Sequence, residues 1–317
     1  KKNESSRENI VQFTVELENV LNGFSEYNKI KQSNLDNTPG RVWNLLINDS
    51  NFELQRKIGQ HTKLKELVQI NRGLITGDRT KYFSSQKTSE KHIPILTGSD
   101  IGRYWSVAPA EYVFFERPKT AGGCWDKEVH LSPHKICIRQ IGFEPIATFI
   151  DDQFAITGNI FSIIGGNKTD EKYYLSIINS RLVKYYWQIM FNDFKTAFPQ
   201  VTLFNISQIP VPTAEQEIKS DIIDIVDTML SKNKELHNLK QALLTLLGAT
   251  VEGLSLSKKL TDWPSLRFKE FLKELKKNVA DSIDESMPSS LKHLRQSGVV
   301  DAFPVLDIYN LRNHLIN

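Results

Sequence analysis

Cysteine, long apolar runs and a strong net charge are all lacking in this sequence, and each absence excludes a class of protein. The 317 residues include only two cysteines, Cys124 and Cys137, which are too few for a disulfide framework and fit reduced thiols. No apolar run approaches the roughly 18 residues that a membrane-spanning helix needs. The net charge of +3 is too small to indicate nucleic-acid binding by itself. We therefore expect a cytoplasmic globular protein without a membrane segment.

Motifs for cofactor and metal chemistry are also lacking. The sequence has no Pro-Pro pair and no P-loop, and we do not expect Gly122-Gly123 or Gly165-Gly166 to lie between a strand and a helix, where a cofactor turn would be. His130 and His134 are four residues apart, but Pro133 prevents the helix that would align them on a metal, which favours surface loop residues. We expect no catalytic residue, metal site or cofactor in this sequence.

Short apolar runs broken by Gly, Pro, Asn and Asp dominate the middle of the chain. Residues 10–17 alternate apolar and polar side chains as a half-buried strand does, and Asp49, Ser50 and Asn51 offer N-cap side chains for a short helix over Phe52–Ile58. The other candidate strands are Leu64–Ile70, His92–Leu96, Tyr112–Phe115, Lys135–Arg139, Ile146–Ile150 and Ile160–Ile164. Strands this short and irregularly spaced predict a mixed or antiparallel sheet.

Two helices with different patterns follow. Residues 172–191 carry apolar side chains every three or four positions, which predicts a helix that packs on the sheet. Thr213 and Gln216 form a capping-box pattern before a second, long helix. Its apolar seam, with Lys232 as the one interruption, predicts packing on another helix, within this domain or outside it: Ile218, Ile222, Ile225, Met229, Leu236, Leu239, Leu243 and Leu246.

Two local patterns have a functional and a plain interpretation. Asp262 followed by Glu274 and Lys276 has the residue types of a nuclease metal site, but that site needs a strand, and the spacing here predicts a helix. Residues 63–103 contain eight Lys or Arg and four Asp or Glu, gathered near turns. Such a surface suits DNA phosphates, and Arg can contact guanine at two atoms, although a solvated loop explains the same charges.

The order of several segments resembles the TaqI-like C-terminal specificity domain of adenine-specific DNA methyltransferases and fused type II restriction–modification enzymes, and more distantly the type I specificity subunits. Residues 73–78 with Phe83 look like the family's opening, and 92–104 are similar to its Ile-Pro-x-Leu-x-Gly-x-Asp-Ile-x-x-Tyr run. The remaining similar segments are 135–142, 159–161, 174–182, 198–201 and 209–212. Each match is weak alone, and their common order is what makes the resemblance specific.

The resemblance implies an α+β fold in which a strand-rich target recognition domain precedes a long heptad helix and a helical tail. We expect a connector at 1–62, the recognition domain at 63–212, the helix at 213–250 and the helical region at 251–317. The chain begins without Met, and we expect an upstream methyltransferase domain that binds S-adenosylmethionine and flips adenine. This portion would then read double-stranded DNA without catalysis, with a methyltransferase domain or subunit as its partner.

The candidate DNA-binding residues are basic or hydroxylic side chains near turns. They are Arg72, Thr76, Arg79, Lys81, Arg103, Arg139, Lys195 and Thr196. Arg79 and Lys195 are favoured because they lie beside polar residues that could reach a groove. Two alternative functions remain, namely a nuclease or other catalytic part of a restriction enzyme, and a protein-interaction scaffold that works through its heptad helix.

Overall fold

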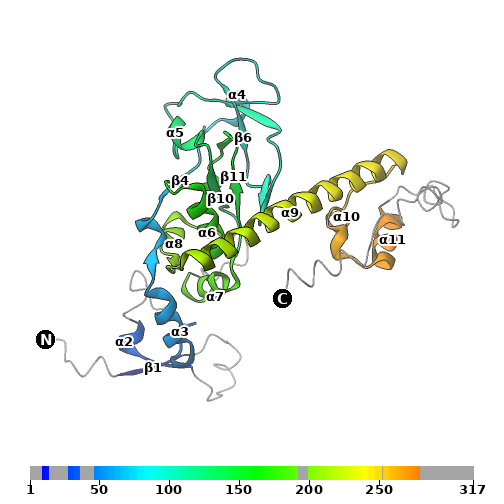
Figure 1. Ribbon diagram of the computed structural model, residues 1–317. Helices are drawn as coiled ribbons and strands as arrows, with labels where there is room; N and C mark the ends of the chain where they lie inside the picture. The colour runs from blue at the N-terminus through cyan, green and yellow to red at the C-terminus, as the bar shows by residue number, and fades with distance from the viewer. Residues whose placement is uncertain (1–8, 14–27, 36–45, 192–198, 252, 279–317) are drawn as a thin grey trace. The chain divides into compact units, whose positions relative to one another are not determined.

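The computed structural model describes residues 9–13, 28–35, 46–191, 199–251 and 253–278 (Figure 1). The chain divides into two compact units, residues 1–231 and 232–317, and the boundary lies inside the long helix α9. The chain as a whole combines strands and helices, as the expected α+β class requires, and all the described strands lie in the first unit. The expected division into four segments stays a prediction.

A four-stranded antiparallel sheet in the order β11-β10-β13-β4 forms the centre of the first unit. Its strands are β4 (Gln69–Arg72), β10 (Lys135–Arg139), β11 (Ala147–Ile150) and β13 (Ile160–Ile164). Both faces are covered, because Ile138 and Phe161 belong to one hydrophobic cluster whereas Cys137 and Ile160 belong to another. Burial on both faces explains why the sequence of β10 is nearly continuous in apolar residues.

A second sheet has the order β12-β6-β9-β5, and it is mixed because β12 runs parallel to β6. Its strands are β5 (Phe83–Ser84), β6 (His92–Leu96), β9 (Glu111–Phe114) and β12 (Ala155–Ile156). The short elements around it are α4 (Arg79–Tyr82), β7 (Ile101–Gly102), β8 (Trp105–Ser106) and α5 (Lys127–His130). The expected mixed or antiparallel pairing is therefore confirmed.

The strand expected over Leu64–Ile70 is wrong in its first half. Leu64–Glu66 form the 3-10 turn η3 between β3 (Thr62–Lys63) and β4. The Leu64 side chain is fully buried, and its backbone N–H donates to the carbonyl of Ile209 at 2.9 Å. Leu64 is apolar because it is buried next to the distant residue Ile209, and not because it lies in a strand. The turn therefore resembles a strand in its apolar content.

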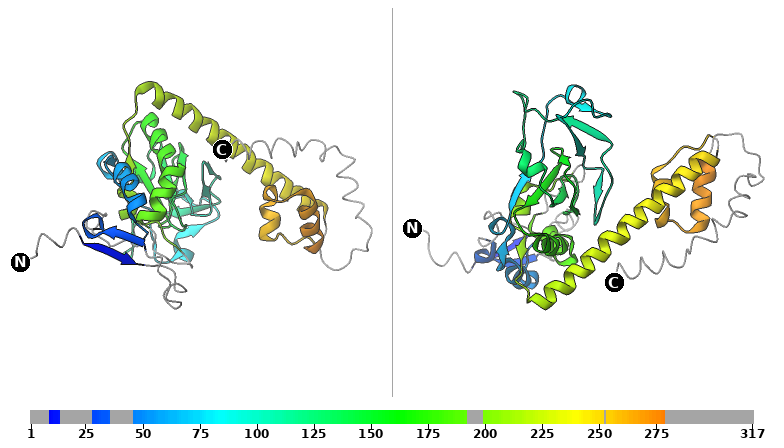
Figure 2. Two further views of the ribbon diagram at one scale, coloured as in Figure 1. Left: turned by 90° about the horizontal axis from the view of Figure 1, so that it is seen from below. Right: turned by 45° about the horizontal axis from the view of Figure 1, so that its top comes forward.

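The helix expected over residues 172–191 is two helices, α6 (Lys168–Asn179) and α7 (Arg181–Met190). Ser180 adopts an extended conformation between them, and its hydroxyl accepts the backbone N–H of Val183 at 3.0 Å. Serine is a strong N-cap, so it ends one helix and starts the next. Both helices pack on the central sheet, as Figure 2 shows beside the green strands, through Leu175, Ile178 and Val183.

The remaining parts of the first unit flank this core. The described N-terminal elements are β1 (Ile10–Phe13), β2 (Asn28–Lys31), α2 (Gln32–Leu35) and α3 (Asp49–Gly59). Asn48 and Asn51 cap α3 reciprocally, which places the cap one residue earlier than expected. After α7 come α8 (Leu203–Ser207) and β14 (Pro210–Val211), which pairs with β3.

The long helix α9 (Gln216–Thr250) begins three residues after Thr213, so the expected cap at Thr213 lies outside it. Its first part packs on the core of the first unit through Ile222, Val226 and Met229. The Lys172 ammonium also contacts Asp227 at 2.5 Å. These contacts explain why the helix begins within the first unit.

The described part of the second unit, residues 232–251 and 253–278, contains the remainder of α9 and three short elements. They are α10 (Lys258–Thr261), the 3-10 turn η4 (Trp263–Ser265) and α11 (Phe268–Lys277). Its core is made of Leu247, Val251, Leu260 and Leu275. Seam residue Leu239 is 43% exposed, so the expected seam is only partly the face that packs here. None of the described helices is long and apolar enough to cross a membrane.

Candidate nucleic-acid interface

Three chain segments cross at the junction of the two sheets, and glycines make the crossing possible. β4 continues through Gly73 to Leu74, whose backbone N–H donates to Ile156 at 2.9 Å. A Cβ on Gly73 would lie 2.2 Å from the carbonyl oxygen of Thr157. Gly73 is therefore required for a close backbone approach, rather than for the positive φ of a turn, which only Gly77 at +77° adopts in this loop.

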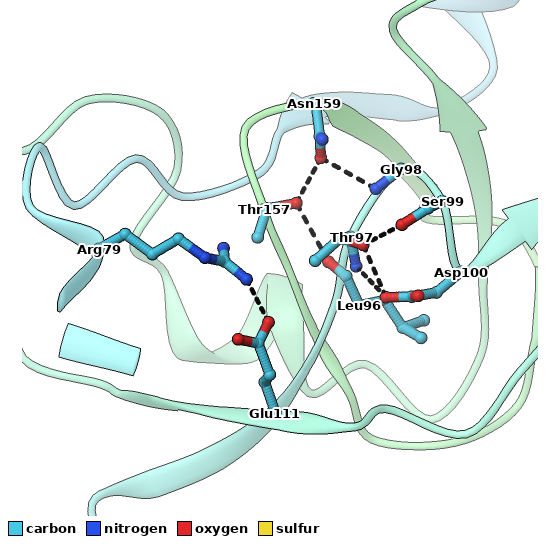
Figure 3. Close-up of polar contacts among 9 residues, drawn as sticks. All are labelled: Arg79, Leu96, Thr97, Gly98, Ser99, Asp100, Glu111, Thr157 and Asn159. Carbon is cyan, nitrogen blue, oxygen red and sulfur yellow. Dashed lines mark hydrogen bonds and ion pairs between the residues drawn. The ribbon is translucent and has the colours of Figure 1, made fainter. Parts of the chain in front are cut away.

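Residues of the family-like run at 92–104 form a hydrogen-bonded network with Thr157 and Asn159 beside this crossing (Figure 3). The Asp100 carboxylate accepts the backbone N–H of Thr97 at 2.7 Å and its hydroxyl at 2.8 Å. Asn159 accepts the backbone N–H of Gly98 at 3.1 Å, and the Thr157 hydroxyl also contacts the Asn159 amide oxygen. These contacts join the turn after β6 to the turn before β13. The run thus forms a rigid support for neighbouring loops.

Arg79 and Lys81 belong to the short helix α4, which Asp78 caps and which leads directly into β5 of the second sheet. The Arg79 guanidinium contacts the carboxylate of Glu111 (Figure 3). Its central carbon lies 4.1 Å from the centre of the Phe83 ring. The Arg79 side chain is 53% exposed, and Lys81 is exposed as well. The turn therefore presents two cations to solvent, one of them fixed in orientation.

Arg72 and Arg139 end two strands of the central sheet. The Arg72 guanidinium donates to the carbonyl of Gly158 at 2.7 Å and to the Gln140 side chain at 3.3 Å. Arg139 is half-buried at the end of β10. Arg72 is exposed but already ties two loops together, so part of its donor capacity serves the fold.

Thr76 and Arg103 have surroundings that belong to the fold, and their contacts with DNA stay a prediction. Thr76 is only 6% exposed. The Arg103 guanidinium donates to the carbonyl of Asn179 at 2.5 Å and to the carboxylate of Glu144 at 2.9 Å. Arg103 thereby attaches the turn between β7 and β8 to the end of α6. Lys195 and Thr196 lie outside the described residues.

Sequence reasoning missed Glu111 and Gln140, the partners of Arg79 and Arg72. Each partner lies more than 30 residues from its arginine along the chain. Only the pairing of β5 with β9 and the meeting of the strand ends bring them together. An acidic residue next to a predicted strand would have been the one available signal for Glu111.

Buried polar side chains join the segments that meet at the junction of the two sheets. His130, which we expected at the surface, is buried, because its Nδ1 accepts the backbone N–H of Ile156 at 3.1 Å and its Nε2 donates to the carbonyl of Cys124 at 2.9 Å. Burial lowers the pKa of His130, which keeps the ring neutral as these two bonds require. The Lys135 ammonium, also buried, donates to the carbonyls of His130 at 2.9 Å and Asp152 at 3.2 Å.

Glu171 is fully buried, and it contacts Nδ1 of His134 at 2.8 Å. Burial raises the pKa of Glu171 to about 7 from its ordinary value of 4.5, although the hydrogen bond from His134 opposes the rise. The folded chain therefore retains this proton up to about pH 7, whereas the unfolded chain loses it near pH 4.5. Because the folded state binds more protons within this window, its stability falls as pH rises through it.

We expect Glu171→Gln to remove this part of the pH dependence. Between pH 5 and pH 8, the free energy of unfolding of the wild type should fall relative to that of the variant by about 1–3 kcal/mol. Urea unfolding at several pH values measures the difference. Glu128→Gln, at an exposed acid on α5, is the control and should leave the curve unchanged. Parallel curves for the wild type and Glu171→Gln would contradict the assignment.

The residues considered for a cofactor turn do not form one. Gly165-Gly166 does lie between β13 and α6, contrary to expectation, but the first turn of α6 carries Asp170 and Glu171. A Cβ on Gly166 would lie 3.3 Å from the Glu171 side chain, so the chain itself fills the turn. Two acids at this helix start also oppose the binding of a phosphate. The turn at Gly123 is likewise filled by the chain itself, because the backbone of Gly73 packs against it.

The nuclease-like residues lie in the second unit, and Glu274 and Lys276 are on a helix as expected. The Glu274 carboxylate accepts from the Asn278 amide at 3.1 Å and from the Ser257 hydroxyl at 3.0 Å, and these two bonds lower the pKa of Glu274. Asp262 contacts the Lys240 ammonium at 2.8 Å. Among the residues that the structure describes, no group of three His, Cys, Asp or Glu side chains is arranged to hold a metal ion.

Comparison with known families divides the chain near the start of α9. Residues 93–211 match the TaqI-like C-terminal specificity domain, and residues 215–297 match a domain of unknown function (DUF8810). The first match confirms the resemblance for most of the expected recognition domain, although the loop with Arg79 and Lys81 precedes its start. No curated protein matches the sequence.

Several solved structures are similar at low identity. One comes from work on the assembly and conformational transition of the type I R-M system, with 15% identity, a TM-score of 0.35, and coverage of 59% of this chain and 43% of that chain. The type IIG restriction endonuclease BpuSI has 14% identity, a TM-score of 0.39, and coverage of 64% and 30%. The HsdS subunit from Thermoanaerobacter tengcongensis has 11% identity, a TM-score of 0.35, and coverage of 61% of this chain and 45% of that chain. This chain thus spans less than half of each.

Proposed function

Given that residues 93–211 form a TaqI-like C-terminal specificity domain, we propose that this chain recognises a short sequence in double-stranded DNA. The observation that carries the proposal is the turn at Arg79 and Lys81, which presents two exposed cations. The neighbouring backbone is held rigidly, because segments approach one another closely at Gly73 and Gly123 and are joined by buried polar hydrogen bonds. DNA recognition needs this combination, since phosphate contacts set the register and rigidly held side chains read bases.

We further propose that the chain is the specificity portion of an adenine-specific methyltransferase of a restriction–modification system. The ordered similarity to that group supports this proposal. The residues described here do not form the Gly-rich turn that S-adenosylmethionine binding would use, so the methyl transfer would be carried out by an upstream domain or a partner subunit. In that arrangement this chain selects the site and the partner modifies it.

Arg79→Ala should weaken binding to the cognate duplex by about 1–3 kcal/mol and binding to a scrambled duplex much less, because a guanidinium fork pairs with a guanine edge. Lys81→Ala should weaken both duplexes alike and lower the salt slope by about one, as loss of a phosphate contact does. The cognate duplex is first selected from a randomised pool with the intact protein. Titrations at two salt concentrations then compare both variants with the wild type.

Lys87→Ala is the matched control, because Lys87 is exposed like Lys81 but lies 3.6 Å from Glu90. It should change neither the affinity ratio nor the salt slope measurably. If Arg79→Ala weakens both duplexes equally, Arg79 does not read bases. If the wild type enriches no sequence from the pool, the proposed function itself is wrong.

A further inference from the structure

Arg79 and Glu111 form an ion pair (Figure 3), and both side chains are accessible to solvent. The side chains are 53% and 35% exposed. An exposed pair of this kind contributes little to stability, typically about 0–1 kcal/mol. Folding stability is therefore a weak reason for this arrangement, and a role at the surface is a stronger one.

The orientation of the guanidinium is fixed from two sides. Glu111, the first residue of β9, contacts one terminal nitrogen, and the ring of Phe83 on β5 lies beneath the guanidinium plane. Because β5 and β9 are hydrogen-bonded neighbours, the ring and the carboxylate keep a constant separation. A guanidinium has five N–H donors, so one bond to Glu111 leaves others to point outward.

The carboxylate likewise retains capacity for a second partner. An ionised carboxylate has two oxygens with about four acceptor positions, and the contact with Arg79 uses one oxygen, Oε2. Side by side, the pair therefore offers fixed donors next to a fixed acceptor. In the major groove a G·C pair presents the complement, with acceptors at guanine O6 and N7 and a donor at cytosine N4.

We propose that Arg79 and Glu111 together read one G·C base pair, Arg79 donating to guanine and Glu111 accepting from the cytosine N4 amine. This inference rests on the proposed function and adds Glu111 as a specificity-determining residue. A thymine at the cytosine position would place its O4 acceptor against the carboxylate, so Glu111 also rejects the wrong base. The same negative charge opposes a phosphate, which lowers binding to DNA in general.

The test selects duplexes from a randomised pool with the intact wild type, Glu111→Gln and Arg79→Ala, and compares base preference position by position. The wild type should prefer G·C at one position by about tenfold or more. Glu111→Gln, which keeps size but has a donor as well as an acceptor, should reduce that preference to within about threefold, at that position alone. Arg79→Ala should alter the same position.

Glu116→Gln is the matched control, because Glu116 follows β9 and pairs with exposed Lys91 at 2.8 Å. It should leave every base preference as in the wild type. Unchanged preferences in Glu111→Gln, or effects of the two variants at different positions, would overturn the inference while leaving DNA recognition intact. A wild type without any base preference would instead refute the proposed function. Thermal unfolding of each variant verifies that the fold is retained.

Discussion

Gly123→Ala should destabilise the first unit by about 3–5 kcal/mol, the largest effect expected from a methyl group added at any glycine that the structure describes. Gly123 adopts a φ of +69°, which L-residues rarely adopt. Its Cβ would also lie 2.0 Å from the carbonyl oxygen of Gly73. The clash is not easily relieved, because the Gly73 N–H donates to the carbonyl of Ile160 at 2.9 Å and the N–H of Cys124, next to Gly123, donates to the carbonyl of Arg72 at 2.9 Å.

The neighbouring residue supplies the control. A Cβ on Gly122 would meet the Ile75 side chain at 3.5 Å and 3.6 Å, which is ordinary van der Waals contact. Gly122→Ala should therefore change the free energy of unfolding by less than about 1 kcal/mol. Urea unfolding followed by circular dichroism compares the two variants with the wild type. Equal midpoints for Gly122→Ala and Gly123→Ala would mean that the crossing is not closely packed.

The strands that the sequence predicted with accurate bounds are those whose local pattern agrees with their burial. His92–Leu96, Lys135–Arg139 and Ile160–Ile164 are observed at the expected residues, because each is rich in β-branched residues and lies inside a sheet. Leu64–Ile70 failed because a single leucine is buried by a contact with Ile209, which is distant in sequence. Local apolar content cannot distinguish the two cases.

The failures at the helices have a similar origin. Apolar spacing continues through Ser180, so the periodicity alone does not reveal that the serine caps a new helix. In α9 the spacing predicted the helix, but not which side is covered, since Leu244 and Leu247 are buried while Ile225 is 62% exposed. The burial of a helix face depends on what packs against it, which periodicity does not contain.

The sequence predicted that the candidate site contains a basic turn, but it did not predict the tertiary partners that orient each basic side chain. Arg79 and Lys81 are exposed in a turn as the charge pattern suggested, whereas Arg103 of the same pattern joins two elements of the fold. The difference comes from Glu144 and Asn179, which approach Arg103 only after the central sheet and α6 have packed. Charge patterns therefore indicate which residues can bind DNA, and tertiary contacts decide which are available.

Asn179, in the family-like segment 174–182, is a motif residue whose side chain binds the backbone of the fold. Its side chain is 7% exposed and forms two hydrogen bonds with one residue of the edge strand β11. Its amide oxygen accepts the backbone N–H of Ala147 at 3.1 Å, and its amide nitrogen donates to the carbonyl of Ala147 at 3.0 Å. The backbone N–H of Tyr104 also donates to the Ala147 carbonyl at 3.0 Å, so Asn179 and Tyr104 together satisfy the outward backbone groups of Ala147 at this edge.

Asn179→Ala should destabilise the first unit by about 2–4 kcal/mol, because it leaves the buried N–H of Ala147 without its acceptor and removes a second bond. Asn179→Asp should be no better, since an oxygen would replace the donor that faces the Ala147 carbonyl. Ser176→Ala, which removes a local bond to Tyr173 within α6, is the control and should cost under about 0.5 kcal/mol. Urea unfolding measures all three variants. If Asn179→Asp were as stable as the wild type, shape rather than hydrogen bonding would hold the edge strand, and the interface loops would depend on packing alone.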